Sequence, residues 1–417
     1  MKVYHSTNGS RIFCIALITV AIVGFTPIIP VAIGYPAVTL FALIAILPKL
    51  SRFRRYPNSL LATCICLYLL WGFVLSLLHI SDGYGTIIQQ MQFLFCILLM
   101  ILIPTILSKR HRAWIMALML LVVCFNIVDN IRLCILYPEI AAAVNRSMDM
   151  VELIGIKINI GGSGWYNGVT FFFTVCFFAF LNVERRLYRY TMLGCLILSG
   201  LFLLGFCLKA SVIVFTLMAA ILLYLAKRYG KNTAYLMVIA FVFIMGYIVV
   251  DLYSDEIVIF IADNIKSKRL AIRLIALVDA DNEEAEVGTV NGRVSLWMLS
   301  LKTWLDNPIN FFMGIGDHSP KYRIDGMGIG YHSAFFDLPA RYGLMGLLLM
   351  YNILRFGFKR VLYFFDKKYY SQVYVIFGMF ILFGFTKSVF TPSVGCSIFL
   401  LLPLSSFIFN GSHIREK

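Results

Sequence analysis

The residues best suited to chemistry lie in the stretch from Gly292 to Gly346. Arg293 opens a segment with helical spacing, where a guanidinium and the free N–H groups of a helix start together favour an anionic ligand. His332 ends a glycine-rich loop directly before an apolar helix, and histidine exchanges a proton near neutral pH. The stretch therefore offers an anion-binding group and a proton-exchanging group in one loop.

The segment that follows Arg293 also has a simpler structural interpretation. Trp297 and Trp304 share one face of the expected helix, which Asn307-Pro308 should end. Two tryptophans on one stripe suit a helix at the level of the lipid headgroups, with Arg293 extended toward water. Both interpretations of Arg293 remain open at this point.

The helix that follows His332 carries unusual charges for an apolar segment. Asp337 and Arg341 are four residues apart, so they are able to pair on one helix face and hold the top of the helix. Ser333 is well placed to cap the helix start. A lone histidine is usually structural, and the position of His332 at the return of the loop is what makes it a candidate.

Other motifs are weaker. Lys209 lies in a tight apolar turn, where its charge is costly unless it reaches water or an anion, whereas Lys387 reads as a lysine that extends to the membrane surface. The acidic run 279–286 contains a DxD but is typical of a solvated loop. The glycines at 326–330 lack the strand and helix that flank a nucleotide-binding loop.

The composition shows what must position these residues. The 417-residue chain is 60% hydrophobic and only 14% charged, which predicts a membrane protein with many spanning helices. The net charge of +15 is divided into short basic clusters between apolar spans, a pattern typical of cytoplasmic loops rather than of nucleic-acid binding. The 10 cysteines show no paired spacing, which argues against disulfides and metal sites.

We expect an all-α, polytopic helical bundle of about twelve transmembrane helices with both termini in the cytoplasm. The first apolar run, from about residue 12, should be a retained helix rather than a cleaved signal peptide. The expected spans are 11–28, 31–49, 59–80, 86–107, 113–135, 168–183, 191–208, 210–226, 234–252, 335–355, 371–390 and 393–411. The chain then divides into N-terminal membrane helices (1–136), a first external loop (137–167), central membrane helices (168–252), a large external loop of short helices that holds the candidate site (253–334), and C-terminal membrane helices with a cytoplasmic tail (335–417).

These features together resemble the superfamily of O-antigen polymerases (Wzy-type) and O-antigen ligases of bacterial polysaccharide assembly. The resemblance is carried by the long late external loop, by GR-x4-W, NP and MGIG, and by G-x-HS before a helix with YG-x-x-G. The best-matching block runs from Asn291 to Gly346. The resemblance implies a bundle like that of the GT-C class of lipid-dependent glycosyltransferases.

The resemblance also implies roles for individual residues. Arg293 matches the loop arginine of the family and His332 its loop histidine, the two catalytic candidates. Lys209 matches the central-turn arginine of the ligases, a departure that keeps the charge but loses the bidentate fork. The other candidates are weaker: Arg341 and Arg323 for binding a diphosphate, and Asn167, Gly328 and Gly330 for lining the cavity.

The implied substrate is an undecaprenyl-diphosphate-linked oligosaccharide in the outer leaflet of the bacterial inner membrane, handled at the periplasmic face. We expect glycosyl transfer with inversion and without a metal or cofactor, in which cations stabilise the departing diphosphate and His332 accepts the proton of the acceptor hydroxyl. Membrane lipid and a chain-length regulator protein are the expected partners, and nucleic acid is not.

Two alternatives remain. A ligase would transfer the glycan to lipid A-core, and we favour the polymerase because position 209 is lysine. A lipid-linked-oligosaccharide flippase would predict charges buried mid-span and two similar halves, a pattern that the sequence lacks.

Overall fold

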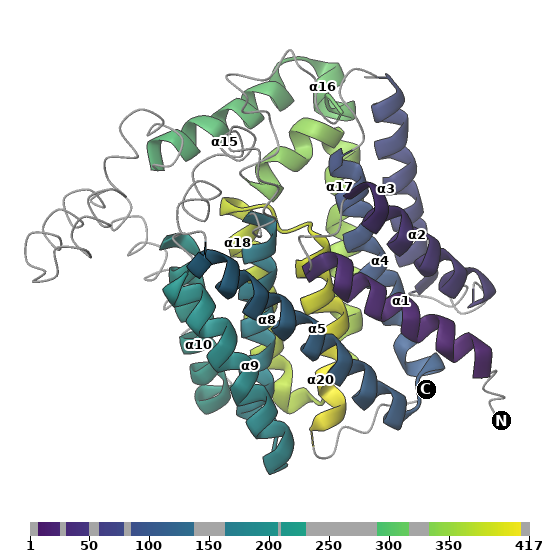
Figure 1. The fold of residues 1–417 in the computed structure, drawn as a ribbon. Helices are drawn as coiled ribbons and strands as arrows, with labels where there is room; N and C mark the ends of the chain where they lie inside the picture. The colour runs from purple at the N-terminus through teal and green to yellow at the C-terminus, as the bar shows by residue number, and fades with distance from the viewer. Residues whose placement is uncertain are drawn as a thin grey trace, which may run out of the picture.

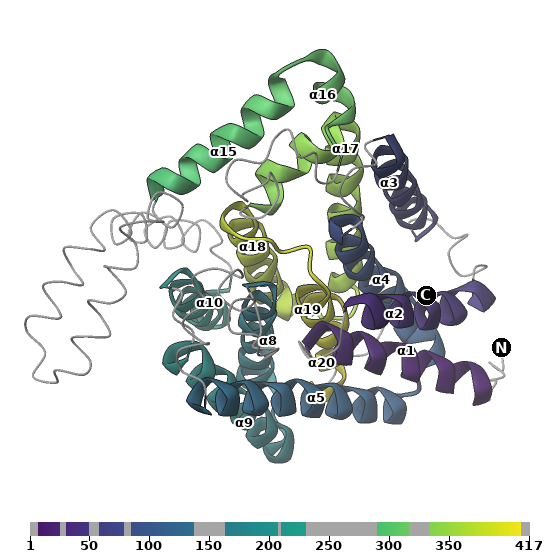
Figure 2. The same ribbon diagram turned by 45° about the horizontal axis from the view of Figure 1, so that its top comes forward.

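The computed structural model describes residues 7–25, 31–49, 58–78, 85–136, 163–206, 210–230, 290–316 and 333–409. Every regular element in these ranges is helical, which confirms the predicted all-α class. Figure 1 shows the helices as a bundle, with α15 and α16 at one end of it. The view in Figure 2 shows the same relationship, with α15 and α16 above α17 and α18.

The described helices have the following bounds: α1 Thr7–Phe25, α2 Val31–Ile46, α3 Asn58–Leu78, α4 Gly85–Ile106, α5 Lys109–Leu136, α8 Ser163–Asn182, α9 Arg186–Gly205, α10 Ala210–Tyr229, α15 Val290–Leu305, α16 Pro308–Met313, α17 Ala334–Leu362, η3 Lys367–Tyr369, α18 Tyr370–Thr386, α19 Pro392–Gly395, the π-helical turn η4 Cys396–Leu401, α20 Leu402–Ser405 and η5 Ser406–Ile408.

Six of the described helices are long and apolar enough to cross a membrane. They are Asn58–Leu78, His111–Leu136, Trp165–Asn182, Arg186–Gly205, Val212–Tyr229 and Lys367–Thr386. Each overlaps a span expected from the sequence. Four shorter apolar helices, Arg11–Phe25, Pro36–Lys49, Gln90–Pro104 and Pro392–Ile408, overlap four more. A helical membrane protein is therefore supported, while the count of twelve spans stays a prediction, and the expected span 234–252 lies outside the described residues.

The helical run Pro392–Ile408 forms the centre of the bundle (Figure 2), and nearly all of its residues are buried. Its neighbours approach closely because they present glycine. A Cβ atom on Gly168 of α8 would lie 2.3 Å from the Ser393 side chain, and one on Gly24 of α1 would lie 3.2 Å from the Pro392 backbone. Close contacts at small residues are a common way for helices to pack in membranes.

Side-chain hydrogen bonds tie α8 to the helices on both sides of it. The indole of Trp165 donates to the Phe25 carbonyl at the end of α1, at 2.7 Å. The amide of Asn182 donates to Gln372 of α18, at 2.6 Å. Because polar groups inside a bundle must find partners, these bonds fix how α8 meets α1 and α18.

Candidate functional site

The start of α17, directly after His332, is fixed by hydrogen bonds. The Ser333 hydroxyl accepts from the Phe336 N–H at 3.2 Å, which confirms the predicted cap. The Asp337 carboxylate accepts from the Ser300 hydroxyl at 2.6 Å and from the Ser333 N–H at 3.1 Å. Ser300 and Asp337 are both buried, so this contact ties α15 to the first turn of α17. The expected ion pair between Asp337 and Arg341 stays a prediction.

The tryptophan stripe of α15 packs against protein. Trp297 stacks on Phe336 of α17 with ring centroids 5.1 Å apart, and Trp304 stacks on Phe311 of α16 at 5.2 Å. The Trp304 indole also donates to the Phe311 carbonyl at 3.0 Å. The stripe that the sequence placed at the lipid headgroups thus fastens α15 to α16 and α17. These contacts fix the position of α15, the helix that carries Arg293. For Arg293 itself, the structure describes the backbone.

Lys387 lies beside the start of α17. It follows the last residue of α18, and its carbonyl accepts from the Ala334 N–H at 3.2 Å. The Ser333 hydroxyl donates to the Gly384 carbonyl at 3.3 Å, which holds the two segments together a second time. Lys387 is half-buried, and the residue that its carbonyl contacts, Ala334, is two residues after His332 in the chain. The sequence favoured a lysine that extends to the membrane surface, which stays a prediction. Its contact with Ala334, more than 50 residues away in the chain, has no local sequence signal.

Asn167 connects α8 to the same region. The structure starts α8 at Ser163, so Asn167 lies inside the helix rather than in the loop expected to end at residue 167. Its buried amide donates to the Ser388 carbonyl at 2.7 Å, one residue beyond Lys387. The first turns of α8, the connection 387–391 between α18 and α19, the start of α17 and the middle of α15 are therefore linked by hydrogen bonds.

Helix α17 is broken at Gly343, where the backbone takes φ 63° and ψ −169°. A break leaves the carbonyls of the preceding turn without helical partners. Three of these carbonyls accept from other segments: Ala340 from the Ile315 N–H at 2.9 Å, Arg341 from the Gly316 N–H at 2.8 Å, and Tyr342 from the Trp71 indole of α3 at 2.9 Å.

Two glycines allow this docking. A Cβ on Gly314 would lie 2.3 Å from the Arg341 carbonyl oxygen, and a Cβ on Gly343 would lie 2.3 Å from the Phe312 carbonyl oxygen. Both glycines also have positive φ, at 78° and 63°, which side-chain-bearing residues rarely adopt. The MGIG segment at 313–316 therefore closes the break in α17. Arg341 is buried at this break, with 2% of its surface exposed.

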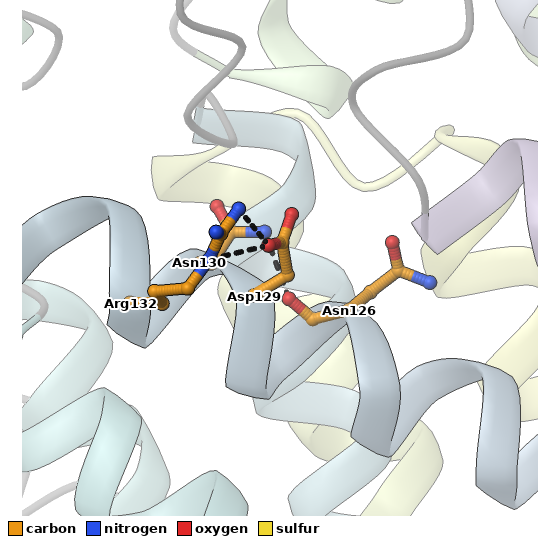
Figure 3. A network of polar contacts seen from close by, with 4 residues as sticks. All are labelled: Asn126, Asp129, Asn130 and Arg132. Atoms are coloured by element: carbon orange, nitrogen blue, oxygen red, sulfur yellow. Dashed lines mark hydrogen bonds and ion pairs between the residues drawn. The ribbon is translucent and has the colours of Figure 1, made fainter.

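Polar side chains also gather near the end of α5 (Figure 3). Arg132 pairs with Asp129, with Nη2 2.9 Å and Nε 3.1 Å from the same carboxylate oxygen. The buried Asn130 amide donates to the Asn126 carbonyl at 2.9 Å. These described partners all belong to α5, so the network braces the helix end.

Five of the sequence-predicted site residues lie outside the described residues: His332, Lys209, Arg323, Gly328 and Gly330. Of the remaining three, Asn167 and Arg341 are buried, and Arg293 is placed by its backbone. The described contacts connect Asn167 to the segment that follows His332, through Ser388, Lys387 and Ala334. They place Arg341 at the break in α17.

Comparison with known proteins does not identify the chain further. No model of a known protein family matches the sequence, and no curated protein matches it. The resemblance to the polysaccharide polymerases and ligases therefore stands on the residues described above.

Proposed function

We propose that this protein is a polymerase of a bacterial surface polysaccharide such as O-antigen, which joins undecaprenyl-diphosphate-linked repeat units. In this proposal the protein is a GT-C-like bundle of about twelve spanning helices in the inner membrane, and its active site faces the periplasm. The observation that carries it is the convergence of four segments: α15 with Arg293, the α17 start directly after His332, the connection with Lys387, and α8 with Asn167.

The chemistry needs a base and cations in one place. In the proposed step, the acceptor hydroxyl oxygen attacks the anomeric carbon of the donor while the bond from that carbon to the diphosphate oxygen breaks. His332 takes the hydroxyl proton, and the configuration at the anomeric carbon inverts. The departing undecaprenyl diphosphate gains negative charge, which preorganised cations stabilise in a site that excludes water.

Arg293 and Lys209 remain the leading candidates for these cations, and we add Lys387 to them. Its backbone carbonyl accepts from the N–H of Ala334, two residues after His332 in the chain. A half-buried lysine in an apolar connection is costly unless it reaches an anion or water. Arg341 is a secondary candidate because its described backbone contact serves the break in α17.

The test is complementation of a strain from which the gene has been deleted, with lipopolysaccharide resolved on a gel. We expect Arg293→Ala and His332→Ala to abolish long chains while the protein is still made. Lys302→Ala, on the exposed face of α15, and His111→Ala, exposed on α5, are the matched controls and should restore normal ladders. Normal ladders from the Arg293 and His332 variants would overturn the site assignment.

The phenotype of the deletion strain decides between the polymerase and its alternatives. Loss of a polymerase leaves a single repeat unit on the lipid A-core, whereas loss of a ligase removes all O-antigen from the core. Loss of a flippase also removes all O-antigen, but the lipid-linked repeat units then accumulate on the cytoplasmic side. Either of the last two outcomes would overturn the polymerase proposal.

A further inference from the structure

Helices α15 and α16 expose large apolar side chains. The exposed residues are Met298 at 46%, Leu305 at 61%, Ile309 at 68% and Phe312 at 58%. These positions belong to a loop that the sequence places outside the membrane, where water would meet them. Exposed apolar residues that follow one another on adjacent helices mark a surface that meets protein or lipid.

The apolar exposure continues onto the helices next to α16. On α17 the exposed residues are Met345 at 52%, Leu348 at 50% and Tyr351 at 58%, and on α3 they are Val74 at 37%, Leu77 at 58% and Leu78 at 63%. Helix α16 docks on the break in α17. At the same break, the Trp71 indole of α3 donates a hydrogen bond to the Tyr342 carbonyl. Helix α3 is long and apolar enough to cross a membrane. Helix α17 therefore connects the exposed apolar residues of α16 to a helix that is able to span a membrane.

Helix α15, the turn at Asp306-Asn307 and α16 form a helical hairpin (residues 290–313), and the polar side chains of its α16 arm have partners inside it. The Asn307 side chain accepts from the Asn310 N–H at 2.8 Å and so caps α16. The Asn310 amide donates to the Thr303 carbonyl at 3.1 Å, and the Gly314 N–H donates to the Asn310 carbonyl at 2.9 Å. Irregular backbone is tolerated at membrane depth only when its polar groups have protein partners, and these three bonds supply such partners at both ends of α16.

The docking point lies well inside the length of α3. This helix has 21 residues, so at about 1.5 Å per residue it is roughly 31 Å long, close to the ~30 Å hydrocarbon layer. Trp71 lies seven residues before Leu78, which is roughly 10 Å from that end of the helix. The break in α17, and with it the end of α16, lies at this depth because Trp71 donates to Tyr342 there.

We propose that α16, one arm of the hairpin, is immersed in the membrane leaflet at the Leu78 end of α3. Ile309 and Phe312 are then in contact with lipid acyl chains. The occupant of this surface is lipid, because α16 docks at a point inside the length of a spanning helix and the polar side chains of α16 find protein partners. Asp306, exposed at the turn before α16, marks the headgroup level. The proposal does not depend on the proposed polymerase function.

Thiol labelling tests the proposal in protein reconstituted into lipid nanodiscs, where both faces are open to a charged, membrane-impermeant maleimide. The variants are Ile309→Cys and Phe312→Cys, with Asp306→Cys as the control from the same hairpin. Only the thiolate reacts, and it is disfavoured in hydrocarbon, so we expect positions 309 and 312 to label at least about tenfold more slowly than 306. The unsubstituted protein gives the background of its native cysteines.

Equal labelling rates at all three positions would place the hairpin in water and overturn the proposal. A second measurement reports on lipid contact directly. The variant Phe312→Trp adds an indole at a surface that is already exposed and aromatic, so the fold should tolerate it. Brominated acyl chains should quench this added fluorescence more than that of the parent protein, and an unchanged quenched fraction would contradict the proposal.

Discussion

The side-chain amide of Asn167 donates a hydrogen bond of 2.7 Å to the carbonyl of Ser388, and this bond joins α8 to the connection between α18 and α19. Asn167 is buried and Ser388 is partly buried. The bond fixes the height of the connection, and with it Lys387, relative to the central helices. Positioning is thus the main role that the geometry gives Asn167.

Replacement of Asn167 by alanine should destabilise the fold by about 0.5–1.5 kcal/mol, because the partly buried hydrogen bond to the Ser388 carbonyl is lost. Thermal unfolding of the purified protein in detergent measures this as a lower Tm. The control is Asn352→Ala, since that amide donates only to the Leu348 carbonyl of its own helix. A Tm for Asn167→Ala as high as that of the control would contradict the anchoring role.

The contact between Ser300 and Asp337 should behave as a coupled pair. Each single alanine substitution breaks the same buried hydrogen bond, so the double variant should lose less stability than the two single losses added together. A coupling of about 0.5–3 kcal/mol is expected for buried groups in contact. Unfolding of the four proteins in a double-mutant cycle measures it. Additive losses would mean that the 2.6 Å bond does not hold α15 to α17.

Gly343 and Gly314 should not tolerate alanine. Each has positive φ, and each would place a Cβ within 2.3 Å of a backbone carbonyl oxygen that has no room to move. We expect Gly343→Ala and Gly314→Ala to give little monodisperse protein on size-exclusion chromatography. Gly378→Ala on α18 is the control, since no atom lies within 4 Å of its Cβ position. A normal yield of either variant would refute the interlocked arrangement.

Local features of the fold were accessible from sequence, and long-range features were not. The Ser333 cap and the end of α15 before Asn307 depend on residues within one helical turn, so both were predicted correctly. The role of MGIG depends on a break in a helix that begins 18 residues later, and no local signal carries that pairing. Periodicity found the amphipathic face of α15 but not its partner, because a stripe that packs on protein and one that lies on lipid read alike.

The interpretation of Lys387 as a lysine that extends to the membrane surface stays a prediction, and its replacement is the sharpest test of the site. Its contact with Ala334 is made by the backbone carbonyl, so Lys387→Ala removes the charge and leaves that hydrogen bond in place. If the side chain stabilises the departing diphosphate, activity should fall by about 100-fold or more, the usual cost of losing one preorganised electrostatic group. Lys387→Arg should restore part of it. The measurement is polymer formation by purified enzyme on a defined diphosphate-linked repeat, with Lys302→Ala as the matched control. Full activity of Lys387→Ala would remove Lys387 from the site and leave the assignment of Arg293 and His332 to be judged by their own variants.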